Sequence, residues 1–115
     1  MDRLTESYYH ILLQQKRSLE KEIEDSRSSR EPIALDQSTQ GRLSRVDAMQ
    51  QQAMAIAVVE RKKIMVKKIE AAMDRCNKGV FGICCDCGDS LSEERLRLDP
   101  ATPFCKECLD MRQKL

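Results

Sequence analysis

Apolar side chains recur every three or four positions along the first thirty residues, with Glu, Lys, Arg and Gln between them. This spacing predicts one helix from residue 2 to about residue 30. The apolar stripe is narrow, as expected for an arm that contacts a single partner helix, and consists of Leu4, Tyr8, Ile11, Leu12, Leu19 and Ile23. Three serines between 26 and 29 and then Pro32 end the pattern, because serine is a weak helix former and the residue before proline avoids the α region.

A second periodic segment runs from about 38 to 78, after a bend at about 32–42 that Asp36 or Ser38 can cap. It contains no Pro and, after Gly41, no Gly before Gly79, which predicts a long helix that ends at this glycine. Its first half has an apolar face that we expect to contact the first arm, formed by Leu43, Val46, Met49, Ala53, Ile56 and Ala57. Its second half is apolar over a broader face, which predicts that a further module packs against Ile64, Met65, Val66, Ile69, Ala72 and Met73.

Four of the chain's six cysteines, all in the remaining segment, form two pairs with zinc-site spacing. Cys84 and Cys87 are separated by two residues, 17 residues follow, and Cys105 and Cys108 are again separated by two. Each pair can turn both sulfurs toward one tetrahedral ion at about 2.3 Å, and Gly82 and Gly88 suit a tight turn that needs a positive φ. The alternatives are two disulfides or ordinary buried thiols. The spacing predicts one structural Zn²⁺.

The predicted fold is therefore mainly α. An antiparallel two-helix coiled-coil hairpin occupies residues 1–78, with arms at about 2–30 and 38–78. A C-terminal four-cysteine zinc-finger module with a short terminal helix occupies residues 79–115, and the helix is expected over 109–115. A module this small depends on its metal to fold. Its expected apolar core is Leu91, Leu96, Leu98 and Phe104.

Composition narrows the classes of function. In 115 residues there is no Trp, charged residues make up 34%, and the net charge is only +1, which gives no overall field to hold a polyanion. No apolar run has the length of a signal peptide or a membrane span, so we expect a cytoplasmic protein that does not bind membranes. In a reducing cytosol, cysteines are more often metal ligands than disulfides.

Nothing in the sequence indicates an enzyme. Four cysteine ligands close the zinc sphere and leave no open position for a reacting water. His10 lies far upstream in the first arm without a nucleophile or base around it, and no catalytic motif is present. Cys85, beside a predicted ligand, is a bystander, a redox thiol or an alternative ligand, and Cys76 is expected to be a small core residue.

Charge on the second helix is uneven. Residues 42 to 78 contain nine basic and four acidic side chains, a local charge of +5. This pattern is either a solvated helix face or a contact surface for a phosphate-bearing ligand or an acidic partner. Near the bend, Asp36 and Asp47 are either turn caps or carboxylates that act on a partner's site.

Together these segments resemble the DksA/TraR family of bacterial RNA-polymerase-binding factors, over about residues 60 to 110 and, by pattern, the hairpin. The resemblance rests on Lys67-Lys68-Ile69-Glu70, Phe81-Gly82-Ile83-Cys84, the cysteine register, and Arg95-Leu96 before a Pro-containing turn. It implies a transcription regulator that binds RNA polymerase without contacting DNA. Its coiled-coil tip would enter the secondary channel and alter initiation at selected promoters, often with guanosine tetraphosphate in the stringent response.

The resemblance also assigns residues. An ungapped alignment places Arg61 and Lys68 on basic positions that line the family's nucleotide site at the polymerase rim. The family's tip motif, Asp-x-x-Asp-x-Ala, does not carry over, because Gly41, Ser44 and Val46 occupy its three positions. Asp36, or Asp47 with Ala48, is the candidate substitute. The first arm begins almost at Met1, which fits a short, specialised paralogue of DksA.

Three other interpretations stay open beside a monomeric polymerase-binding regulator. A zinc-ribbon nucleic-acid binder would have basic residues on the zinc module, yet residues 84 to 115 contain seven acidic and five basic side chains. A thiol-based redox-responsive regulator would use Cys85 and the zinc thiolates. A dimeric coiled-coil adaptor is a further alternative.

Overall fold

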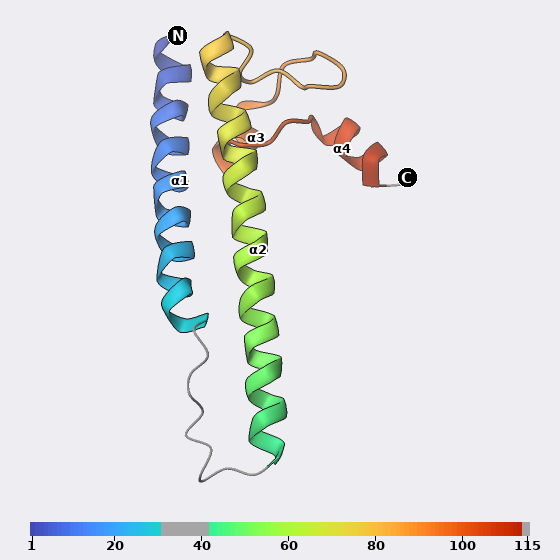
Figure 1. The fold of residues 1–115 in the computed structure, drawn as a ribbon. Helices are drawn as coiled ribbons and strands as arrows, with labels where there is room; N and C mark the ends of the chain where they lie inside the picture. The colour runs from blue at the N-terminus through green and yellow to red at the C-terminus, as the bar shows by residue number, and fades with distance from the viewer. Residues whose placement is uncertain (31–41, 114–115) are drawn as a thin grey trace. The chain divides into compact units, whose positions relative to one another are not determined.

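The computed structural model describes residues 1–30 and 42–113, and within the helices the side chains of residues 1–26 and 45–113. This part of the chain contains four helices and no strand (Figure 1). They are α1 (Arg3–Arg30), α2 (Arg42–Lys78), α3 (Glu93–Leu98) and α4 (Lys106–Gln113). Two long helices that pack together, followed by a cysteine cluster, confirm the predicted fold class. Among the described residues, no helix combines the length and apolar character needed to span a bilayer.

Contacts divide the chain into two compact units. Unit 1 comprises Met1–Lys16 and Lys67–Leu115, and unit 2 comprises Arg17–Val66. Each unit therefore contains one part of α1 and one part of α2, and only unit 1 contains the cysteine module.

The buried positions of α2 follow a heptad repeat. Val59, Val66 and Met73 lie seven residues apart, with Ile69 and Cys76 each three residues further on, and all five side chains are buried. On α1, Tyr8 and Leu12 are buried whereas Leu4 and Ile11 of the predicted stripe are exposed. Alternating steps of three and four residues are the coiled-coil spacing. This part of the fold is a helix pair with a narrow apolar seam, as predicted.

The predicted apolar face in the first half of α2 is wrong where side chains are described. Val46, Met49 and Ile56 are all exposed. The heptad that passes through Val59 runs back through Ala55, Gln52 and Ala48, which are small or polar and leave little to bury. Within unit 2 an ion pair joins the two helices, with Lys62 Nζ 3.4 Å from Glu22 Oε2.

The ends of the long helices have local causes. The Asp2 carboxylate accepts a hydrogen bond from the Thr5 N–H at 2.7 Å, which caps α1 and lowers the pKa of Asp2. At the end of α2, Gly79 has a φ of 74°. The Gly79 N–H donates to Cys76 O and the Val80 N–H donates to Arg75 O, which is the Schellman pattern. The stop predicted at Gly79 is confirmed.

The C-terminal module differs from expectation in three places. Leu98 is 87% exposed and is not a core residue, whereas Leu91 and Leu96 are buried. The unpredicted helix α3 begins after Ser92, whose hydroxyl accepts from the Arg95 N–H at 3.2 Å. The terminal helix α4 begins at Lys106, three residues earlier than predicted, so that it includes Cys108.

Candidate metal centre

The four paired cysteines come together at one point of unit 1. The sulfurs of Cys84, Cys87, Cys105 and Cys108 all lie within 4.8 Å of one another. Cys87 Sγ and Cys105 Sγ are 3.8 Å apart, and all six cysteines are free thiols, so the disulfide alternative does not hold. Four sulfurs around a tetrahedral zinc at 2.3 Å stand about 3.8 Å apart. This donor set fits one structural zinc ion.

The first pair sits on a tight turn built from backbone hydrogen bonds. The Cys84 N–H donates to Asp89 O at 2.8 Å, and the Gly88 N–H donates back to Cys84 O at 3.0 Å. Gly88 takes a φ of 77°, a value that side chains with a Cβ rarely adopt. An isolated bridge between Ile83 and Ser90 closes the turn. These contacts hold the first pair of cysteines in a tight turn.

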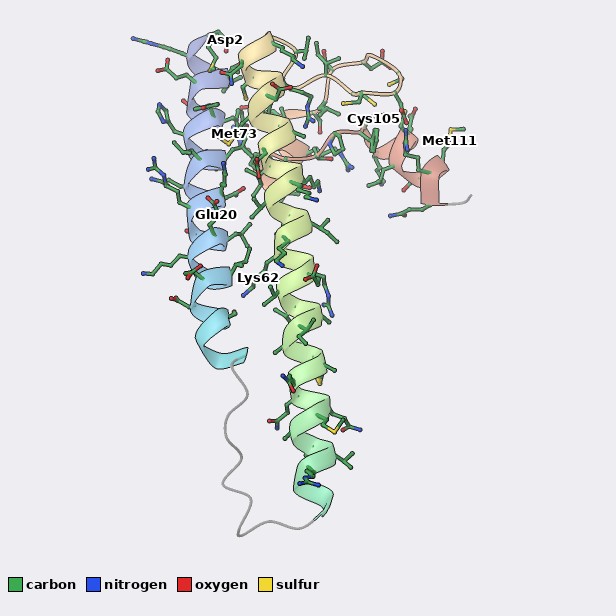
Figure 2. All side chains as sticks on the ribbon, in the orientation of Figure 1. Asp2, Glu20, Lys62, Met73, Cys105 and Met111 are labelled. Atoms are coloured by element: carbon green, nitrogen blue, oxygen red, sulfur yellow. The ribbon has the colours of Figure 1, made fainter. Side chains whose placement is uncertain are left out.

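The second pair lies at the start of α4, where Cys105 is labelled in Figure 2. The Cys108 N–H donates to Cys105 Sγ at 3.5 Å, and the Leu109 N–H donates to Cys105 O at 2.9 Å. The two pairs are tied through the backbone, since the Cys85 N–H donates to Pro103 O at 2.8 Å. A main-chain hydrogen bond therefore joins the segments that contain the two cysteine pairs.

Electrostatics at the cluster favour a cation. Hydrogen bonds from the backbone N–H of Cys87, with further ones from Cys105 and Asp86, lower the pKa of the Cys84 thiol to about 6. By contrast, the side-chain hydrogen bond with Cys105 raises the pKa of Cys108. The Cys84 thiol is thus more acidic and the Cys108 thiol less acidic than an ordinary cysteine, and sulfurs this close repel one another once their protons are lost. A dication replaces those protons and relieves the repulsion.

The core of the module includes the predicted Leu91, Leu96 and Phe104, together with one metal-facing cysteine and a residue of α1 that the sequence did not reveal. Cys84 is buried in a cluster with Tyr8 of α1, Leu91 and Leu96, and Phe81 and Phe104 pack against it. The Tyr8 and Phe81 ring centroids are 5.4 Å apart. The small number of aromatic residues could have indicated this core. The chain has only two Tyr and two Phe, and three of these four rings lie here. The start of α1 thereby packs, through Tyr8, against the core that contains Cys84.

The other predicted site residues are spread over the chain. Cys76 is buried, and burial raises the pKa of its thiol, as expected for a core residue. Cys85 is exposed and lies outside the group of four sulfurs. In unit 2, Asp47 and Arg61 are exposed and Ala48 is half-buried, while Asp36 lies outside the described residues.

Two basic side chains of α2 reach the turn after α3. Lys68 Nζ lies 3.0 Å from Asp99 Oδ2, and Arg75 Nη2 donates to Ala101 O at 3.4 Å. Met73, between these two positions on α2, is buried (Figure 2). These contacts join α2 to the cysteine module within unit 1. Of the broad apolar face predicted for the second half of α2, Val66, Ile69, Ala72 and Met73 are buried. The prediction is wrong at Ile64 and Met65, which are exposed.

Comparisons with known proteins agree with this geometry. Residues 79–112 match the model of the prokaryotic DksA/TraR C4-type zinc finger. The fold is similar to the structure of transcription factor DksA2 from Pseudomonas aeruginosa, with a TM-score of 0.81 and 23% identity over 99% of this chain and 87% of that one. It is also similar to the solution structure of the DnaK suppressor protein from Agrobacterium tumefaciens C58, with a TM-score of 0.63 and 28% identity over 96% of both chains. Residues 79–112 are therefore similar to the DksA/TraR zinc finger, and the fold of the chain is similar to that of DksA2 and of the DnaK suppressor protein.

A curated relative shares a shorter segment with this chain. An uncharacterized protein of Aquifex aeolicus (strain VF5) is 36% identical over 45 residues, which is 39% of this chain and 31% of the relative. The match thus spans about a third of the relative's length. This similarity indicates no activity for the chain.

Proposed function

We propose that this chain is a cytoplasmic transcription regulator that binds RNA polymerase directly and modulates initiation at selected promoters. In this proposal the hairpin of residues 1–78 inserts its bend into the secondary channel, and residues 79–115 form the zinc-stabilised module. The observation that carries the proposal is a DksA-like fold over nearly the whole chain together with a zinc finger of the DksA/TraR type. The protein would act by binding and not as an enzyme.

The exposed surface of unit 2 supports a binding role for the hairpin. On α2, Met49, Met54 and Ile56 all leave at least two fifths of their area exposed. Apolar side chains that are not needed for the unit's own core are available to a partner. We propose that Asp47, or Asp36 in the bend, supplies the carboxylate that acts at the polymerase active centre.

We expect the contact with guanosine tetraphosphate to differ from the one that the family resemblance implies. Lys68, one of the two basic residues assigned to the nucleotide, is already paired with Asp99 at 3.0 Å. A phosphate has to compete with this carboxylate for the same ammonium group. We therefore propose regulation of the polymerase that does not require guanosine tetraphosphate.

The test is in vitro transcription from a ribosomal-RNA-type promoter with the cognate polymerase, with and without guanosine tetraphosphate. We expect a promoter-selective change that is equal in both arms. The Asp36→Asn, Asp47→Asn double variant is expected to lose the effect while still binding polymerase in a pull-down. Asp74→Asn, an exposed acid paired with Lys78 on α2, is the matched control and is expected to act like the wild type.

Three results would contradict parts of the proposal. If the wild type neither binds polymerase nor changes transcription, direct regulation is wrong. An effect seen only with the nucleotide would mean that phosphate displaces Asp99 from Lys68. Binding to promoter DNA in the absence of polymerase would favour the zinc-ribbon alternative.

A further inference from the structure

An ion pair joins α4 to the first cysteine turn. Arg112 Nε lies 2.6 Å from Asp86 Oδ2, and Arg112 Nη2 lies 2.7 Å from Asp86 Oδ1. Asp86 stands between Cys85 and Cys87, and Arg112 is four residues after Cys108. The contact is therefore bidentate and connects the two halves of the metal centre through side chains alone.

The same guanidinium makes a second contact. Its carbon lies 4.2 Å from the centroid of the Phe104 ring, in a cation–π arrangement. Phe104 immediately precedes Cys105 and packs against the core that contains Cys84. Arg112 thus contacts residues adjacent to one cysteine of each pair.

Helix α4 has little else in the described residues to hold it. None of its side chains is fully buried, Met111 is exposed (Figure 2), and Cys108 is the α4 residue that packs at the edge of the core around Cys84. A helix of eight residues is far too short to be stable alone in water. Exposed ion pairs usually contribute little, but planar bidentate geometry on a segment without a core is the case in which they matter.

The negative sulfur cluster adds to the hold on Arg112. Hydrogen bonding to Asp86 is the main reason that the pKa of Arg112 is raised, and the charges of Cys108 and Cys84 raise it further. Four thiolates around Zn²⁺ leave a net charge of −2, which a fixed guanidinium partly compensates.

We propose that Asp86 and Arg112 form a latch that holds α4, with Cys108, against the first cysteine turn and so retains the zinc. When the latch is open, the Cys105–Cys108 half of the site detaches first. The inference rests on the metal centre and is independent of polymerase binding. Groups just outside a metal's ligands typically change metal affinity by about 10–100-fold when they are mutated.

The test is the rate of zinc transfer from the loaded protein to a chromophoric chelator. Arg112→Met and Asp86→Asn are each expected to release zinc about 10-fold faster or more. Arg112→Lys is expected to be intermediate, because it keeps the charge without the planar fork. Arg97→Met is the matched control, since it breaks an exposed ion pair with Glu93 at 2.9 Å that is confined to α3, and its rate should equal that of the wild type.

A second readout separates the latch from general unfolding. In the zinc-loaded variants, hydrogen exchange should rise in residues 106–113 and stay unchanged in residues 67–78 of α2. Release rates within 2-fold of the wild type for both Arg112→Met and Asp86→Asn would overturn the proposal. So would an equal increase in exchange over both segments. If Arg112→Met fails to load one zinc, the comparison of Asp86→Asn with Arg97→Met decides.

Discussion

The two units contain parts of the same two helices but differ in what they bury. In unit 1 the buried side chains include Tyr8, Leu12 and Ile69, together with the core around Cys84. In the described residues of unit 2, only Val59 and Val66 are buried. Since burial of apolar surface is the main driving force of folding, unit 1 is stabilised by its own core and unit 2 has little core of its own. The contrast fits a division between a scaffold and a surface offered to a partner.

Removal of zinc should have the largest effect on stability. It should reduce the protection of backbone amides from hydrogen exchange in unit 1 and leave that of unit 2 unchanged. Apparent binding of a structural zinc contributes about 10–16 kcal/mol in small zinc domains, so Cys105→Ser or a strong chelator should unfold the module. Before removal, slow amide exchange should be found in unit 1 and fast exchange in residues 45–66. Afterwards unit 1 should exchange as fast as unit 2.

The control for zinc removal is Cys85→Ser. Its side chain is exposed and lies outside the group of four sulfurs, so one zinc and the native exchange pattern should be retained. Zinc loss in this variant would mean that Cys85 and not Cys84 is a ligand. Slow exchange in residues 45–66 of the native protein would contradict the difference between the units.

Tyr8→Ala should have the second largest effect on the free energy of unfolding. Truncation of a buried aromatic side chain costs about 3–5 kcal/mol, and Tyr8→Ala removes the ring that packs against Phe81 beside Cys84. Met54→Ala in unit 2 is the matched control, because its side chain is exposed and its change should lie within about 0.5 kcal/mol. Urea unfolding of the zinc-loaded proteins measures both. Equal losses would show that unit 2 depends on its apolar residues as much as unit 1 does.

Gly79→Ala should have an intermediate effect. An added Cβ meets nothing within 4 Å, so the cost comes only from the left-handed φ of 74° and is about 1–2 kcal/mol. Gly79→Asn should recover part of this loss, since Asn tolerates that conformation. The same urea unfolding reports it. An unchanged midpoint in Gly79→Ala would mean that the end of α2 is not held by the module that follows.

What the sequence predicted well depends on local chemistry. The two-residue spacing within each cysteine pair and the stop at Gly79 each need only neighbouring residues, and both are found in the structure. Helix α3 also had a local signal that sequence reasoning missed, in Ser92 followed by Glu93 and Glu94. Local signals therefore accounted for the helix ends and for the grouping of the cysteines.

What the sequence did not predict depends on contacts between distant segments. The packing of Tyr8 beside Cys84 joins residues 76 positions apart, and no periodicity within α1 distinguishes it from exposed Leu4. Likewise, the apolar pattern of α2 includes both the heptad through Val59 and a neighbouring face through Met49, and only the structure shows which one is buried. The prediction that Leu98 is a core residue is wrong for the same reason, because Leu98 of α3 is exposed whereas Leu96 is buried.

Removal of one ion pair from each unit should have the smallest effect on stability, and the two units should respond differently. Lys62–Glu22 joins α1 to α2 in unit 2, and Lys68–Asp99 joins α2 to the module in unit 1. Exposed pairs contribute about 0–1 kcal/mol, so neither Glu22→Gln nor Asp99→Asn should shift the urea midpoint much.

However, a unit with little core depends more on each contact. Glu22→Gln should therefore raise exchange in residues 45–66, and 1 M salt should produce the same rise in the wild type. Asp99→Asn should leave exchange in residues 67–78 unchanged, because Ile69, Ala72 and Met73 stay buried there. If Asp99→Asn raises exchange more than Glu22→Gln does, burial is not what distinguishes the two units.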